Sequence, residues 1–165
     1  MKDFLLGTYA QTLNMAKTLV ADVPCERFAE LPFPGAKHPG WVLSHLSIGG
    51  AMGDAFLREP ENPTPAMEGV PMEWMQSAMG EPEGNRDAFA KKEEIIAALE
   101  RTHASFSERF AAASDDVLAM PNPSPGFREV FPTIGSGAFY LLGYHEGYHL
   151  GQLQQWRRAA GFPAG

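Results

Sequence analysis

Four long segments of this chain carry their apolar residues at the spacing of one face of an α-helix, which repeats about every 3.6 residues. These segments run over Asp3–Val20, Pro39–Arg58, Asp87–Ala113 and Thr133–Ala160. The 165 residues of the chain are enough for one domain that buries roughly two-thirds of its unfolded surface without cross-links. The sequence therefore predicts an all-α fold, a four-helix bundle formed by a single domain over residues 1–165.

Two turn-rich connections separate the helical segments. The first, Pro60 to Arg86, is longer than the two to eight residues common between bundle helices and contains one expected short helix, Met72 to Met79. We expect this connection to cross the bundle or to cover one of its ends. The second, Ser114 to Pro132, is also rich in turn residues. Either connection could form a wall of a site.

Charge and composition exclude several classes of partner and compartment. The chain has 20 acidic and 13 basic residues, a balance that offers no electrostatic footprint for nucleic acid or for an anionic membrane. It shows no secretory signal pattern at its start and no apolar stretch of about 18 residues. The only cysteine, Cys25, has no partner for an internal disulfide. We expect a cytoplasmic protein with neither nucleic-acid nor membrane partners.

Two histidines in the last helical segment give the clearest indication of chemistry. His145 and His149 are four residues apart, which places both imidazoles on one face of a helix, one turn apart. Two buried imidazoles each need a polar partner, and one shared metal ion satisfies both. A catalytic site of this kind usually has three protein ligands and an open position. The leading candidate for the third ligand is His45, which lies in the middle of the apolar stripe of the second segment.

The remaining histidines and a nearby amide are expected to have other roles. His103 lies between Leu99 and Phe106, and a single histidine on an apolar face is more often a hydrogen-bonded core residue than a ligand. His38 precedes Pro39 and is expected in a loop. Gln152 lies three residues after His149, where we expect it to form a hydrogen bond rather than to bind metal.

The string from His145 to His149 also matches the His-Glu-x-x-His signature of zinc peptidases. Those enzymes take their third ligand from further along the chain, either a Glu or a His six residues after the second histidine. Here residues 150–165 contain no Asp, Glu, His or Cys, and Gln155 occupies the sixth position. The peptidase interpretation is therefore disfavoured. Glu146 remains a candidate general base, a hydrogen-bond acceptor for a ligand, or a solvated surface acid.

Three glycines form a ridge on the same helical segment, about opposite the histidine face. Gly143, Gly147 and Gly151 each cost on the order of 1 kcal/mol of helix propensity relative to alanine. Close approach of another helix is the usual reason for such a ridge, and that helix can belong to the same chain or to a second subunit. Because the ridge faces away from the expected core, we favour a partner protomer and predict a homodimer.

Several of these residues together resemble a known family. The chain has an aromatic residue shortly before His45 in Trp41-Val42-Leu43-Ser44-His45, a His-x-x-x-His-x-x-Gln pattern from His145 to Gln152, and a closing Arg-Arg-x-x-Gly at Arg157 to Gly161. This combination is similar to the DinB/YfiT-like superfamily over nearly the whole chain, most sharply in the last helix. The resemblance implies an antiparallel four-helix bundle with a long crossover connection, often a homodimer. It also implies a divalent metal ion held by His45, His145 and His149.

The resemblance implies a reaction only in outline. Several such proteins transfer a low-molecular-weight bacterial thiol to an electrophile or use it to isomerise a substrate, and many have no known activity. The first hypothesis is a metal-dependent thiol S-transferase or hydrolase, with Glu146 as its candidate base. The second is a noncatalytic bundle with a structural or sensory metal, which a fourth protein group such as His103 or Gln152 would close. Three imidazoles suit zinc, nickel, iron or copper, of which we expect zinc or nickel first and iron next.

Overall fold

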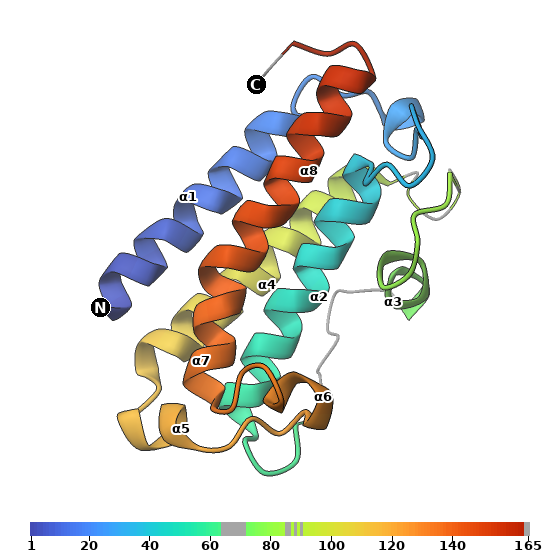
Figure 1. Ribbon diagram of the computed structural model, residues 1–165. Coiled ribbons are helices and arrows are strands. Elements are labelled where there is room, and N and C mark those ends of the chain that lie inside the picture. Colours follow the sequence, from blue (N-terminus) through green and yellow to red (C-terminus); the bar gives the residue numbers. More distant parts are fainter. Residues whose placement is uncertain (64–71, 85–86, 88, 90, 164–165) are drawn as a thin grey trace.

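Helices account for all the named elements of the computed structural model, which describes residues 1–63, 72–84, 87, 89 and 91–163 (Figure 1). The long helices are α1 (Lys2–Val20), α2 (Pro39–Arg58), α4 (Lys92–Ala112), and a run of α7 (Ile134–Phe139), η2 (Tyr140–His145) and α8 (Glu146–Ala159). Shorter ones are η1 (Cys25–Arg27), α3 (Met72–Ala78), α5 (Asp115–Ala119) and α6 (Pro125–Arg128). No strand occurs in the described part of the chain. The predicted all-α class is confirmed.

The long helices lie side by side, and α3 lies beside α2 (Figure 1). Apolar side chains from the long helices form two core clusters. One includes Leu43, Leu99 and Trp156, and the other includes Phe106 and Leu142. Four of these side chains are fully buried: Trp156, Phe106, Leu43 and Leu99. Burial of each one stabilises the fold by on the order of 2 kcal/mol. No helix in the described part of the chain has the length and hydrophobicity needed to cross a membrane.

Local sequence signals explain where the helices begin. The His38 side chain accepts a hydrogen bond from the backbone N–H of Trp41, and Pro39 occupies the first turn, so α2 begins where the sequence predicted. Thr133 and Ser136 form a capping box at the start of α7. Helix α4 instead begins at Lys92, later than the predicted Asp87. The reason lies in Phe89, which is buried against Gly40 and the His38 ring from a turn rather than from a helix.

The last helix differs from the predicted continuous α-helix because six residues of it, Tyr140–His145, adopt π geometry. A π turn closes i→i+5 hydrogen bonds and therefore holds more residues per turn than an α turn. The faces of α7 and α8 are consequently offset from a single 3.6-residue period. Such segments are frequent at functional sites, and this one ends on His145.

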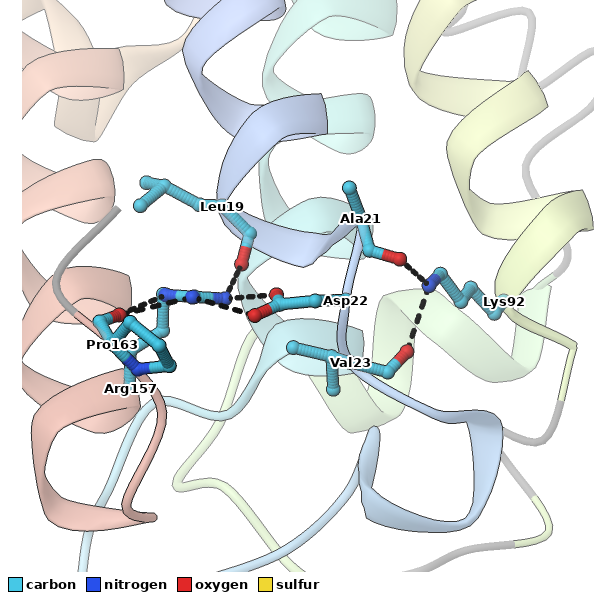
Figure 2. Close-up of polar contacts among 7 residues, drawn as sticks. All are labelled: Leu19, Ala21, Asp22, Val23, Lys92, Arg157 and Pro163. Carbon is cyan, nitrogen blue, oxygen red and sulfur yellow. Dashed lines mark hydrogen bonds and ion pairs between the residues drawn. The ribbon is translucent and has the colours of Figure 1, made fainter.

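Two cationic side chains, Arg157 of α8 and Lys92 of α4, bind the C-terminal end of α1 and the residues just after it (Figure 2). The buried guanidinium of Arg157 donates to both carboxylate oxygens of Asp22, at 2.6 and 3.0 Å, and to the carbonyl oxygens of Leu19 and Pro163. These hydrogen bonds lower the pKa of the Asp22 carboxyl group. Lys92 donates to the carbonyl oxygens of Ala21 and Val23. Carbonyl groups in the last turn of α1 and in the turn that follows it thus accept hydrogen bonds from cations of α8 and α4.

Candidate metal centre

Three histidine side chains meet between α2, η2 and α8. His45 comes from α2, His145 ends η2 and His149 lies in the first turn of α8. The Nε2 atoms of His45 and His145 are 3.0 Å apart, and one ring nitrogen from each of the three residues lies within 4.8 Å of the others. A tetrahedral ion with bonds of about 2.0–2.1 Å would separate its nitrogen ligands by about 3.3 Å. The structure thus brings together all three predicted ligands at a spacing that one ion can bridge.

Hydrogen bonds on the outer nitrogens orient two of these rings. The Nδ1 atom of His45 is 2.8 Å from the carbonyl oxygen of Ala78, and Nδ1 of His149 is 2.8 Å from Oε1 of Gln152. Because these oxygens only accept hydrogen bonds, each Nδ1 carries the proton and each Nε2 keeps its lone pair. Metal-binding histidines are usually held this way. The donor set therefore fits a metal ion, and Gln152 has its predicted hydrogen-bonding role.

Hydrogen bonds from three side chains at the start and in the first half of α2 hold the first connection against this helix. Side chains of His38, Trp41 and His45 donate to the carbonyl oxygens of Glu83, Gly80 and Ala78, at 3.1, 3.1 and 2.8 Å respectively. Trp41 also stacks on the His45 ring, with 4.6 Å between ring centroids and 11° between planes. The connection thereby supplies a hydrogen-bond acceptor to the cluster, and the Trp41 ring of α2 supplies a fixed surface beside it. His38 serves as a helix cap and a tether, and it does not reach the three histidines.

Burial keeps the three imidazoles neutral. It lowers the pKa of His145 to about 3 and that of His149 to about 4, and the neighbouring rings of the cluster add to the effect. Burial also lowers the pKa of His45. A neutral imidazole is the form that binds metal. Protons therefore compete weakly with a metal ion for His145 and His149 at neutral pH.

These lowered values predict how the stability of the metal-free protein depends on pH. Unfolded histidines titrate near 6.5, so between about pH 6.5 and pH 3–4 the unfolded state binds more protons than the folded state. The free energy of unfolding should therefore fall as the pH drops through this window, and the contribution should be complete above it. Urea unfolding with EDTA at several pH values measures this. His145→Gln should give a shallower slope, and an unchanged slope would contradict the prediction.

A pocket of about 250 Å³ opens beside the cluster. His45 and His145 form part of its wall, together with Ile48, Gly49, Met52, Phe56, Met79, Phe127, Tyr140 and Leu141. Met79 follows α3 in the first connection and Phe127 belongs to α6 in the second. Both turn-rich connections therefore contribute to the wall of one site, as their composition allowed.

Glu146 lies in the core, so the alternative of a solvated surface acid is wrong. Its Oε1 atom is 3.3 Å from Nε2 of His103, and the exposed fraction is 2% for the Glu146 side chain and 3% for that of His103. The ring of Tyr9 stacks on His103 at 3.7 Å between centroids. His103 is thus a core histidine, as predicted, although its Nε2 atom has no hydrogen-bond partner among the described residues. Glu146 does not belong to the group of side chains that could share the ion, and a role as base stays a prediction.

The glycine ridge has no neighbour within the described chain. A Cβ atom added at Gly143, Gly147 or Gly151 would meet nothing within 4 Å. The alternative of a crowded crossing inside the chain is therefore wrong for the described residues. A partner subunit on this face stays a prediction.

Comparison with known proteins gives one match. The sequence model of the DinB superfamily matches residues 8–153, a range that includes all three histidines of the cluster. Neither the curated proteins nor the solved structures contain a significant match to this chain. The match covers most of the chain and agrees with its all-helical fold.

Proposed function

We propose that this chain, which belongs to the DinB superfamily, binds one divalent metal ion through His45, His145 and His149 and uses it to activate a thiol or water. The observation that carries this proposal is the convergence of three neutral imidazoles, two of which have their outer nitrogens fixed by Ala78 and Gln152. A divalent ion with an open coordination position would lower the pKa of a thiol or water bound there. Zinc and nickel are the proposed metals, followed by iron.

The finer architecture belongs to the same proposal. We propose that residues 1–165 form one domain, an antiparallel four-helix bundle of α1, α2, α4 and the α7–α8 run. The contacts of α2 with α4 and α8, and of α1 with α4 and α8, support this arrangement. The connection between α2 and α4 would be the long crossover. Its hydrogen bonds to His38, Trp41 and His45 support a role in holding the site.

A catalytic role is supported better than a structural one by what surrounds the cluster. His103, one suspect for a closing fourth ligand, contacts Glu146, and the other, Gln152, contacts Nδ1 of His149. Two of the three histidines face the pocket, so a substrate in the pocket would have access to them. We therefore propose a thiol S-transferase or hydrolase. The contact of Glu146 with His103 supports a structural role for this carboxylate over its predicted role as a base.

The proposed thiol chemistry can be tested on cobalt-loaded protein. Adding 2-mercaptoethanol should produce a sulfur-to-cobalt charge-transfer band, because the thiol takes the open position. With 1-chloro-2,4-dinitrobenzene as electrophile, the sulfur should form a bond to the ring carbon while chloride leaves and the thiol proton passes to solvent. We expect at least tenfold acceleration over EDTA-treated protein and none in His149→Ala. No band and no acceleration, with thiol or with water as nucleophile, would leave the structural-metal alternative.

We further propose that this is a cytoplasmic bacterial protein that forms a homodimer through the exposed face of η2 and α8. Tyr144 and Tyr148 are 66% and 53% exposed and lie on the same helical run as the glycine ridge, which supports a helix-packing face. Sedimentation should show a dimer at micromolar concentration. Gly147→Glu should dissociate it, whereas Gly7→Glu, at a glycine of α1 that is equally free of neighbours, should not. A monomeric parent protein would remove this proposal.

A further inference from the structure

We infer that the pocket beside the three histidines binds the uncharged, largely apolar part of the co-substrate that the thiol or water attacks. This inference rests on the proposed function, because it takes the histidine cluster as the reacting centre. His45 and His145 form one side of the pocket wall. A molecule seated in the pocket would therefore present one end to the cluster and the rest of its surface to the remaining wall.

The chemistry of that wall selects against charge. Apart from the two histidines, the lining residues are aliphatic, aromatic, glycine or methionine, and no Asp, Glu, Lys or Arg is among those described. An ionised group placed against this wall would lose hydration without gaining a partner of opposite charge. Uncharged apolar groups gain from the same burial. The wall should therefore discriminate between a neutral compound and a charged compound of the same shape.

Volume limits the size of the occupant. The pocket measures about 250 Å³. Engineered apolar cavities of roughly 150 Å³ bind benzene, while pockets for drug-sized molecules begin at about 300 Å³. The pocket therefore suits one aromatic ring or a branched alkyl group with a short arm. Met52 and Met79 give the wall some adaptability, because methionine side chains are flexible and polarisable.

Two further wall residues lie beside the His145 ring. A Cβ atom added at Gly49 would lie 3.2 Å from Cε1 and 3.4 Å from Nδ1 of His145, so glycine leaves room beside this ring. Tyr140, whose ring centroid is 5.3 Å from that of His145, carries the only aliphatic or phenolic hydroxyl of the described wall. A phenol hydroxyl can donate a hydrogen bond. The occupant should therefore be apolar along its body and tolerate a hydrogen-bond acceptor on the Tyr140 side of the wall.

Three probes of similar shape test the inference: benzyl alcohol, benzoate and benzylammonium. Amide chemical shifts are followed by NMR in EDTA-treated protein at neutral pH. Benzyl alcohol should shift the amides of Gly49 and Leu141 and saturate, whereas the two ions should bind at least tenfold more weakly. Equal binding of either ion, or no saturable shift at the pocket with benzyl alcohol, would overturn the inference.

A charge placed at the rim provides a second measurement. Met79 is 54% exposed and lines the pocket, so Met79→Lys should fold and should improve benzoate binding several-fold. Met15, a residue of α1 with 48% exposure, does not line the pocket, and Met15→Lys should change nothing. An identical response in both variants would mean that benzoate binds elsewhere.

These measurements separate the inference from the proposal on which it rests. Probe binding is recorded without metal, so its result does not depend on whether the histidines bind an ion. The result of metal analysis, in turn, does not depend on what the pocket binds. Loss of metal binding with intact probe selectivity would remove the proposed function, and the reverse result would remove only the apolar-substrate inference.

Discussion

Replacing either His45 or His149 with alanine will lower metal affinity at least 100-fold, while the parent protein will hold about one equivalent. Each substitution leaves two imidazoles, which is fewer than the three protein ligands typical of an open site. Gln152→Ala should have a smaller effect, about 10–100-fold, because it removes only the hydrogen bond to Nδ1 of His149. Elemental analysis of purified protein and calorimetric titration with zinc measure both effects.

Thermal unfolding gives an independent readout of the same site. A ligand present at 100 times its dissociation constant stabilises the folded state by about 2.7 kcal/mol. Zinc should therefore raise the Tm of the parent protein and leave that of His45→Ala and His149→Ala unchanged. If all three proteins carried the same amount of metal and gained the same Tm, the three-histidine site would be refuted.

The second large effect concerns the buried pair of His103 and Glu146. Replacing His103 with leucine should lower the free energy of unfolding by about 1–3 kcal/mol, because it leaves the buried carboxyl group of Glu146 without its nearest polar contact. Glu146→Leu should also be strongly destabilising. Urea unfolding in the presence of EDTA measures these changes without any contribution from bound metal.

A double-mutant cycle separates the interaction from the loss of packing. Replacing both partners with leucine removes both buried polar groups, so the double variant should lose less stability than the sum of the single variants. Additive losses would mean that the two side chains do not interact. Glu146→Gln keeps an oxygen toward His103 and should retain metal affinity within a factor of a few. A large loss of affinity in this variant would instead support a direct role for Glu146 at the site.

Much of the fold follows from local sequence signals. Helix α2 has the predicted bounds because Pro39 and the His38 cap mark its start. The convergence of His45 with the later pair was also predictable, since i,i+4 spacing fixes one face of a helix and His45 lies at the middle of its apolar stripe. The start of α4 was not predictable from the sequence, because burial of Phe89 against Gly40 depends on tertiary packing.

Other parts of the site have no signature in the sequence. The acceptor for His45 is the backbone carbonyl of Ala78, and any residue type could provide it. Glu146 is buried because the protein covers a wider face of α8 than the face that carries the histidines. Glu146, Leu150, Leu153 and Arg157 are buried at steps of three and four residues, and this second stripe was the available signal. This signal was easy to miss, because an acidic residue type usually indicates an exposed position.

The π segment lets the last helix carry one more residue than α geometry would hold without turning its second half away from the core. In an α-helix each residue turns the chain by about 100°, whereas a π turn spreads its rotation over more residues. Losing one residue from this stretch while it tightens to α geometry would therefore leave His149 facing His45, and Ala138 on the earlier half would keep its contacts with the core. Related chains that keep the three imidazoles should thus tolerate a stretch shorter by one residue, with α geometry in place of π geometry.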